Sequence, residues 1–101
     1  MVKHYILWQL KDEFSAEEKE TIKNNIKEGL EGLQGQIPGL VSIKVIKDGL
    51  LSSSNADLML DSTFEDAEAL AGYTVHPAHV AVATGAVRPN VKVRMVCDYE
   101  C

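Results

Sequence analysis

The sequence predicts an α+β fold, and three features of the 101-residue chain support this prediction. Apolar and polar residues alternate over residues 2–11, which is typical of a β-strand. Two segments carry the Ser-x-x-Glu pattern of a helix N-terminus, one beginning at Ser15 and one at Ser62. A second alternating segment covers residues 91–99 near the end of the chain. A chain of this length forms one domain, residues 1–101, with one hydrophobic core.

The first half of the chain is predicted to form a strand, a helix and a second strand. Tyr5 and Leu7 make the second face of the first strand partly apolar, so both of its faces need to be covered. Helices can cover one face, and a short chain lacks the material for the other, so we expect a second subunit to cover it. The helix begins at the capping box of Ser15 and Glu18. Its apolar stripe consists of Ile22, Ile26, Leu30 and Leu33, and the next strand covers residues 40–47.

The second half is predicted to contain a short strand over residues 56–60, two helical segments and a last strand. The pattern Ser62-Thr63-Phe64-Glu65 predicts a helix that opens there and stops near Gly72. Pro77 begins a further helix that extends to about residue 85, because proline is favoured in a first helical turn. Met59 and Met95 fall within strands and are expected in the core.

The predicted order of elements is β-α-β-β-α-β with a split second helical region. This is the order of a ferredoxin-like subunit. In that topology the first and last strands are antiparallel neighbours, so the start of one lies beside the end of the other. We therefore expect His4 to lie close to Asp98, although 94 positions separate them in the sequence.

The composition excludes several classes of function. The net charge of −5 argues against nucleic-acid binding, which requires a basic surface. No apolar run approaches the roughly 20 residues of a membrane span, and the N-terminal residues lack a signal-peptide pattern. We therefore expect a cytoplasmic protein with no membrane partner. Cys97 and Cys101 would lie about 13 Å apart in one strand, too far for a disulfide, so free thiols are expected.

The segment Tyr73-Thr74-Val75-His76-Pro77-Ala78-His79 gathers side chains that carry chemistry. A histidine oriented by a carboxylate acts as a general base, so His79 and Asp98 are candidate catalytic residues. Tyr73 could donate a hydrogen bond to a developing oxyanion. The carboxylate would raise the pKa of the histidine it holds, whereas burial would lower it.

Structural roles explain the same residues equally well. His4 shares a strand face with Ile6 and Trp8, where a histidine is usually a hydrogen-bonded core residue. The tyrosine and the two histidines of the 73–79 segment could simply fix the split between two helices. A single sequence supplies no geometry, so the catalytic and the structural interpretations both stay open.

No cofactor or metal is expected. His76 and His79 are three positions apart and would need a carboxylate as third ligand. Gly29, Gly32 and Gly35 lie at a helix end rather than after a strand, so they do not form a dinucleotide fingerprint.

Four sequence elements together carry a resemblance to a known family. They are Val2-Lys3-His4, Ile37-Pro38-Gly39, Tyr73-x-x-His76-Pro77-x-His79 and Asp98-Tyr99. They resemble the stress-responsive A/B barrel (Dabb) family of the dimeric α+β barrel superfamily, over nearly the whole chain. The resemblance implies a ferredoxin-like subunit that pairs with a second copy through its sheet. Most members have no established activity.

One plant member of the family, olivetolic acid cyclase, closes a linear polyketide by an aldol step. The resemblance implies that its catalytic histidine, supporting carboxylate and cavity tyrosine match His79, Asp98 and Tyr73. It also matches the cyclase's N-terminal strand histidine to His4, whereas a further cavity histidine is matched by Leu58.

Two functions therefore follow from the residues and the resemblance. The first is a homodimer that binds a small apolar or phenolic molecule in a cavity between sheet and helices. The second is a cofactor-free enzyme, either a cyclase or another enzyme of the dimeric barrel type, that uses His79 as general acid and base.

Overall fold

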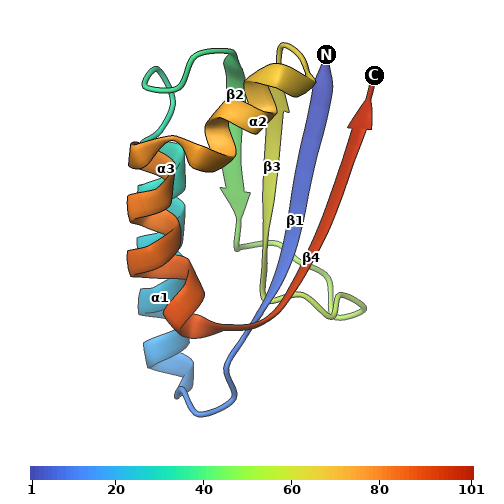
Figure 1. The fold of residues 1–101 in the computed structure, drawn as a ribbon. Helices are drawn as coiled ribbons and strands as arrows, with labels where there is room; N and C mark the ends of the chain where they lie inside the picture. Colours follow the sequence, from blue (N-terminus) through green and yellow to red (C-terminus); the bar gives the residue numbers. More distant parts are fainter.

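Three helices cover one face of a four-stranded antiparallel sheet in the computed structural model, which describes residues 1–101 (Figure 1). The strands are β1 (Val2–Leu10), β2 (Leu40–Ile46), β3 (Leu58–Phe64) and β4 (Val91–Glu100), in the spatial order β2-β3-β1-β4. The helices are α1 (Ala16–Glu31), α2 (Ala67–Val75) and α3 (Pro77–Val82). This is the predicted ferredoxin-like arrangement. None of these helices is long and apolar enough to cross a lipid bilayer.

Helix α1 begins at the predicted capping box. The Ser15 hydroxyl accepts a hydrogen bond from the Glu18 N–H at 3.1 Å, and the Glu18 carboxylate accepts one from the Ser15 N–H at 2.9 Å. The apolar stripe of the helix faces the sheet, where Ile26 and Leu30 are fully buried. This stripe and the covered face of the sheet form the hydrophobic core.

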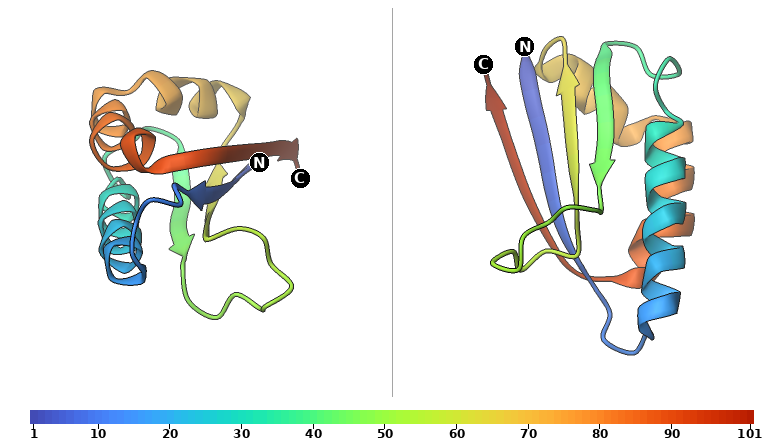
Figure 2. Two further views of the ribbon diagram at one scale, coloured as in Figure 1. Left: turned by 90° about the horizontal axis from the view of Figure 1, so that it is seen from below. Right: turned by 180° about the vertical axis from the view of Figure 1, so that it is seen from behind.

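We call the sheet face under the helices the inner face and the opposite one the outer face. On β1, alternate residues are buried on the inner face: Val2, His4, Ile6, Trp8 and Leu10. Figure 2 shows that all helices lie on this one side of the sheet, whereas the loop of residues 47–57 extends toward the other side. The chain itself therefore leaves most of the outer face without a covering layer.

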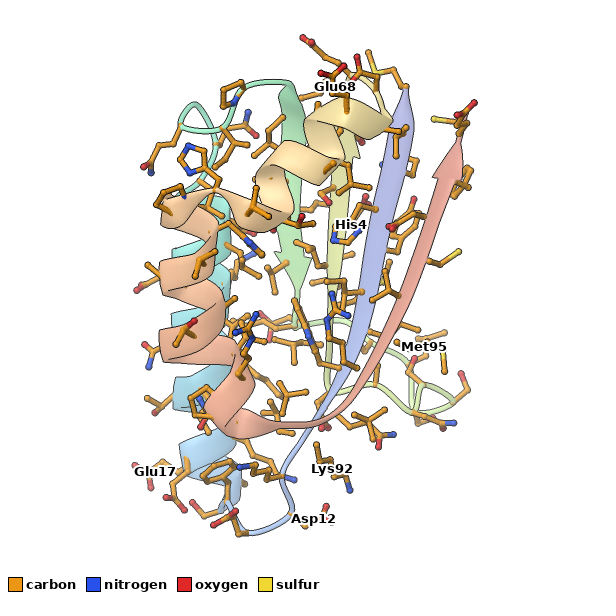
Figure 3. The ribbon with its side chains drawn as sticks, viewed as in Figure 1. His4, Asp12, Glu17, Glu68, Lys92 and Met95 are labelled. Carbon is orange, nitrogen blue, oxygen red and sulfur yellow. The ribbon has the colours of Figure 1, made fainter.

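The outer face carries apolar side chains that stay accessible. Leu7 is 38% exposed, Val93 42%, Met95 62% and Tyr99 47%. The prediction of Met59 and Met95 as core residues is wrong, because both pair with Leu7 on the outer face (Figure 3 labels Met95). Strand alternation identifies two apolar faces but does not show which one the helices cover.

The predicted boundaries around Ser62 are wrong. Ser62 lies within β3, where it pairs with His4, and its hydroxyl donates to the His4 carbonyl oxygen at 2.9 Å. Asp66 is the true N-cap of α2, since its carboxylate accepts from the Ala69 N–H at 2.7 Å. The capping-box pattern failed here because pairing with β1 keeps this segment extended. The helix also continues past Gly72 to the end of α2.

The split between α2 and α3 forms at the predicted His-Pro pair. His76 has extended backbone angles, and its Nδ1 accepts a hydrogen bond from the Ala78 N–H at 3.1 Å. Pro77 occupies the first turn of α3, where its missing N–H is not needed. The chain then continues through a π-helical turn (Ala83–Val87) and a 3₁₀ turn (Arg88–Asn90) into β4.

Candidate functional site

The pairing of β1 with β4 brings His4 and Asp98 together, as the topology predicted. They are register partners, and His4 Nδ1–H donates to Asp98 Oδ1 at 2.5 Å. The imidazole is buried and the carboxylate is partly exposed on the edge strand. Figure 3 shows His4 directed from β1 toward the helical layer. The histidine that Asp98 holds is therefore His4, and not His79.

Tyr73 lies between the two histidines. Its ring centroid is 4.1 Å from that of His79 and 6.0 Å from that of His4. The side chain is only 1% exposed, and its hydroxyl has no hydrogen-bond partner. Burial raises the pKa of Tyr73 to about 12, while the positive charge of Arg94 acts in the opposite direction. Tyr73 therefore keeps its proton at neutral pH and is available as a hydrogen-bond donor.

His79 is oriented by a backbone group rather than by a carboxylate. Its Nδ1 lies 3.3 Å from the Thr74 carbonyl oxygen. A carbonyl oxygen only accepts, so Nδ1 carries the proton, and Nε2 of the uncharged ring keeps a free lone pair.

Burial is the main cause that lowers the pKa of His79. The hydrogen bond with Thr74 opposes this effect, and the positive charges of His4, Arg88 and Arg94 add to it. Of the two opposing effects expected from the sequence, only burial acts on the pKa of His79, because Asp98 contacts His4 instead. The lowered pKa favours the uncharged ring at neutral pH, in which Nε2 can accept a proton.

A cavity of about 310 Å³ lies between the inner face and the helices, and we call it the inner cavity. Side chains from the sheet, from the three helices and from the turns before β4 form its wall: Ile6, Trp8, Leu30, Leu60, Tyr73, His79, Ala83, Val87, Arg88 and Arg94. Tyr73 and His79 thus face it together, as predicted. His4 is not among its lining residues and contacts it only through Tyr73.

Three polar residues of this wall were not predicted from the sequence: Trp8, Arg88 and Arg94. The Trp8 Nε1–H is buried and has no partner, like the Tyr73 hydroxyl. One sequence signal was available, because Arg94 and Asp98 are four positions apart on one strand and so share a face. The antiparallel pairing of the first and last strands, which was expected to place Asp98 beside His4, therefore also places Arg94 beside Trp8.

A second hollow, of about 450 Å³, lies on the outer face. The loop of residues 47–57 forms one side of it, and Leu7, Met59 and Met95 form the other. None of its lining residues titrates, whereas the inner cavity combines a histidine, a tyrosine and two arginines. The inner cavity is therefore the better candidate for chemistry, although it is smaller.

The remaining candidates give no further site. No three His, Cys, Asp or Glu residues come together in a way that could hold a metal ion. The Nδ1 of His76 is occupied as the cap of α3. Cys97 and Cys101 are free, exposed thiols.

Comparison with known proteins identifies the family. Residues 2–101 match the model of the Stress responsive A/B Barrel Domain, Dabb. The chain belongs to this family. No curated protein matches it.

Several solved structures are similar to this Dabb chain. A dimeric protein of unknown function with a ferredoxin-like fold, from Bacteroides fragilis, is 30% identical with a TM-score of 0.90, covering 99% of this chain and 95% of the other. A protein from Arabidopsis thaliana is also 30% identical, with a TM-score of 0.74 and coverage of 100% and 95%. A hydroxynitrile lyase from Passiflora edulis is 18% identical, with a TM-score of 0.72 and coverage of 97% and 90%. At that identity the lyase shows the common fold alone.

Proposed function

We propose that this Dabb domain is a homodimer that binds a small apolar or phenolic molecule in the inner cavity. The observation that carries the proposal is the Tyr73 hydroxyl, which is buried, protonated and without a partner beside that cavity. An unpaired buried hydroxyl costs about 1–3 kcal/mol. A ligand oxygen that accepts from Tyr73 would recover this free energy.

The rest of the cavity fits the same class of ligand. Ile6, Leu60 and Val87 provide apolar contacts for a hydrocarbon or an aromatic ring. The free Nε2 of His79 can accept a hydrogen bond from a ligand hydroxyl while Tyr73 donates to a second oxygen. A phenol satisfies both requirements because it has an apolar body and a hydroxyl that donates and accepts.

The same pair of side chains favours a cofactor-free enzyme as the second candidate. An uncharged His79 could take a proton from a carbon beside a carbonyl group, so that the proton goes to Nε2 and the electron pair to the carbonyl oxygen. Tyr73 could stabilise the resulting oxyanion by donating its O–H. In a cyclase-like reaction, the enolate would then attack a second carbonyl of the same molecule. In this arrangement Thr74 orients His79, while Asp98 acts on His4.

Homodimerisation is proposed from the outer face. A sheet face with exposed Leu7, Met95 and Tyr99 and no covering helix is typical of a subunit interface. The similar protein from Bacteroides fragilis is described as dimeric. A stable interface on this face should bury well over about 1,000 Å² in total.

Thermal-shift measurements with a series of small phenols test the binding proposal. Wild type, Tyr73→Phe and His79→Ala are compared at one protein concentration. A ligand at one hundred times its Kd adds about 2.7 kcal/mol, which raises the Tm of a domain of this size by about 10–20 °C. Tyr73→Phe should leave the unliganded Tm unchanged or higher, because it removes an unpaired buried hydroxyl, and should reduce the shift caused by the phenol.

His79→Ala separates the two functions and a structural role. A binding protein should lose affinity only, whereas an enzyme should lose turnover with its fold intact. A fall of several degrees in the unliganded Tm would instead assign His79 to the fold. If no phenol shifts the wild-type Tm at millimolar concentration, the binding proposal is wrong.

A further inference from the structure

Both arginines of the chain, Arg88 and Arg94, line the inner cavity. Neither guanidinium has an ion-pair or hydrogen-bond partner among the side chains and backbone of the chain. Four of the lysines, in contrast, are paired with carboxylates: Lys3 with Asp61, Lys27 with Glu31, Lys47 with Glu20 and Lys92 with Asp12. Acidic residues outnumber basic ones in the chain, but none of them is in the cavity wall that both arginines line.

The two guanidiniums act on the polar groups of the cavity. The positive charges of Arg88 and Arg94 each contribute to lowering the pKa of His79, after burial as the main cause. Arg94 also acts on Tyr73, whose pKa burial raises. The geometry agrees with these effects, because Arg88 and Arg94 line the same cavity as Tyr73 and His79, and Arg94 is the register partner of Trp8.

The polar groups of the cavity wall are nearly all hydrogen-bond donors. Trp8 Nε1–H and the Tyr73 hydroxyl are buried and unpaired, and the two arginines add their guanidinium N–H groups. Among the lining side chains only His79 Nε2 and the Tyr73 hydroxyl oxygen can accept a hydrogen bond, and no carboxylate lies in the wall. A set of donors with two positive charges matches a group that has several acceptor oxygens and a negative charge.

We infer that the inner cavity selects a small monocarboxylic acid with an apolar body, whose carboxylate is held by Arg88 and Arg94. The inference rests on the proposed function and names the class of ligand for the same site. Guanidinium groups match carboxylate oxygens in geometry as well as in charge. The apolar remainder of the wall accommodates the body of the acid and disfavours a ligand with many polar groups. The volume of about 310 Å³ is about twice that of an apolar cavity that holds benzene, so it admits a body of one or two rings or a short chain.

Calorimetric titration with phenylacetate and with phenylacetamide tests this inference. The two probes have nearly the same shape, and only the first carries a charge. Wild type is compared with Arg88→Gln, Arg94→Gln and Arg94→Lys. Lys92→Gln is the matched control, since it removes one positive charge from the same strand at a residue outside the cavity. The affinity for phenylacetamide reports whether each variant keeps a folded cavity.

Wild type should bind phenylacetate at least tenfold more tightly than phenylacetamide, which corresponds to about 1.4 kcal/mol. Arg94→Gln and Arg88→Gln should each remove most of this preference without changing phenylacetamide affinity. Arg94→Lys should retain part of it, and Lys92→Gln all of it.

Equal affinity of the wild type for the two probes would overturn the carboxylate inference and leave binding in the cavity intact. A preference that survives both arginine substitutions would overturn it in the same way. If the wild type binds neither probe at millimolar concentration while it binds a phenol, the inference is wrong but the proposed function stands. If it binds none of these molecules, both are wrong.

Discussion

The two faces of the sheet are both apolar, but they differ in the polar groups that they carry. The inner face combines its apolar residues with a buried His4 and with a cavity that contains Tyr73 and His79. The outer face exposes Leu7 and Met95, and its largest hollow has no titratable group. Apolar character on the inner face thus serves folding, and we propose that it also serves ligand binding there and subunit association on the outer face.

This difference arises from one alternation along β1. Even-numbered residues point to the inner face and odd-numbered ones to the outer face, as in any strand. A substitution at one position therefore tests one face with little direct effect on the other. The following predictions use this property, from the largest expected effect to the smallest.

Ile26→Ala should lower the free energy of unfolding by about 2–5 kcal/mol. Ile26 is 0% exposed in the α1 stripe that packs on the inner face, so the truncation leaves a cavity in the core. Urea denaturation at fixed protein concentration measures the effect. Glu28→Ala, at an exposed position of the same helix, is the control and should change stability little. Equal losses for the two variants would show that the buried helix face is misassigned.

Met95→Glu should weaken the proposed dimer at least a hundredfold, or about 2.8 kcal/mol, because it places a charge in an apolar interface. Sedimentation velocity over a range of concentrations measures the dissociation constant. Val75→Glu is the matched control, since Val75 is also exposed and apolar but lies on α2 in the helical layer. Dimerisation unaffected by Met95→Glu and lost in Val75→Glu would place the interface on the helical side instead.

Asp98→Ala should lower the free energy of unfolding by about 1–3 kcal/mol, because it leaves the buried Nδ1–H of His4 without an acceptor. Asp98→Asn keeps an acceptor oxygen and should cost less. The Tm values of wild type, Asp98→Ala and Asp98→Asn, measured by thermal unfolding, test this order. A smaller loss for the alanine variant than for the asparagine variant would argue that solvent readily replaces the carboxylate.

The ionisation of His79 should make the protein less stable as the pH drops below about 6.5, which is the unperturbed pKa of a histidine. The folded-state pKa of His79 is lowered, so the unfolded chain binds more protons in this range. The contribution of uncharged His79 to stability is fully present above the pKa of the unfolded chain. It is lost as the pH falls through the pKa of the folded chain. His79→Gln should flatten this part of the Tm-versus-pH curve. An unchanged pH dependence in His79→Gln would show that another group controls it.

Most of the fold could be predicted from the sequence, because strong local signals set it. The capping box at Ser15 and the proline at position 77 start helices as expected. The pattern at Ser62 predicted a helix N-terminus, but pairing with His4 on a distant strand decided the structure there. Local patterns predict an element well only where long-range pairing does not compete with them.

The candidate site was predicted only in part. The topology was enough to bring Asp98 beside His4, since antiparallel neighbours fix which residues meet. The choice between His4 and His79 as partner of that carboxylate needed side-chain positions. The position of Arg94 in the cavity wall was indicated only by the strand face that it shares with Asp98, because the cavity exists only after α3 and the following turns pack over the inner face.

The indole N–H of Trp8 gives the most direct test of the claim that the inner cavity binds the ligand. Trp8 is the only tryptophan, so its Nε1–H gives a single indole signal in a ¹H–¹⁵N correlation spectrum. This N–H is buried in the chain and has no partner. Because Trp8 borders both hollows, titration with a phenol that raises the Tm should shift this signal together with the amide signal of His79, which lines only the inner cavity, and both should saturate with the same Kd. A phenol that stabilises the protein while the indole signal stays fixed, and the amide signals of Leu7 and Met95 move, would contradict the account.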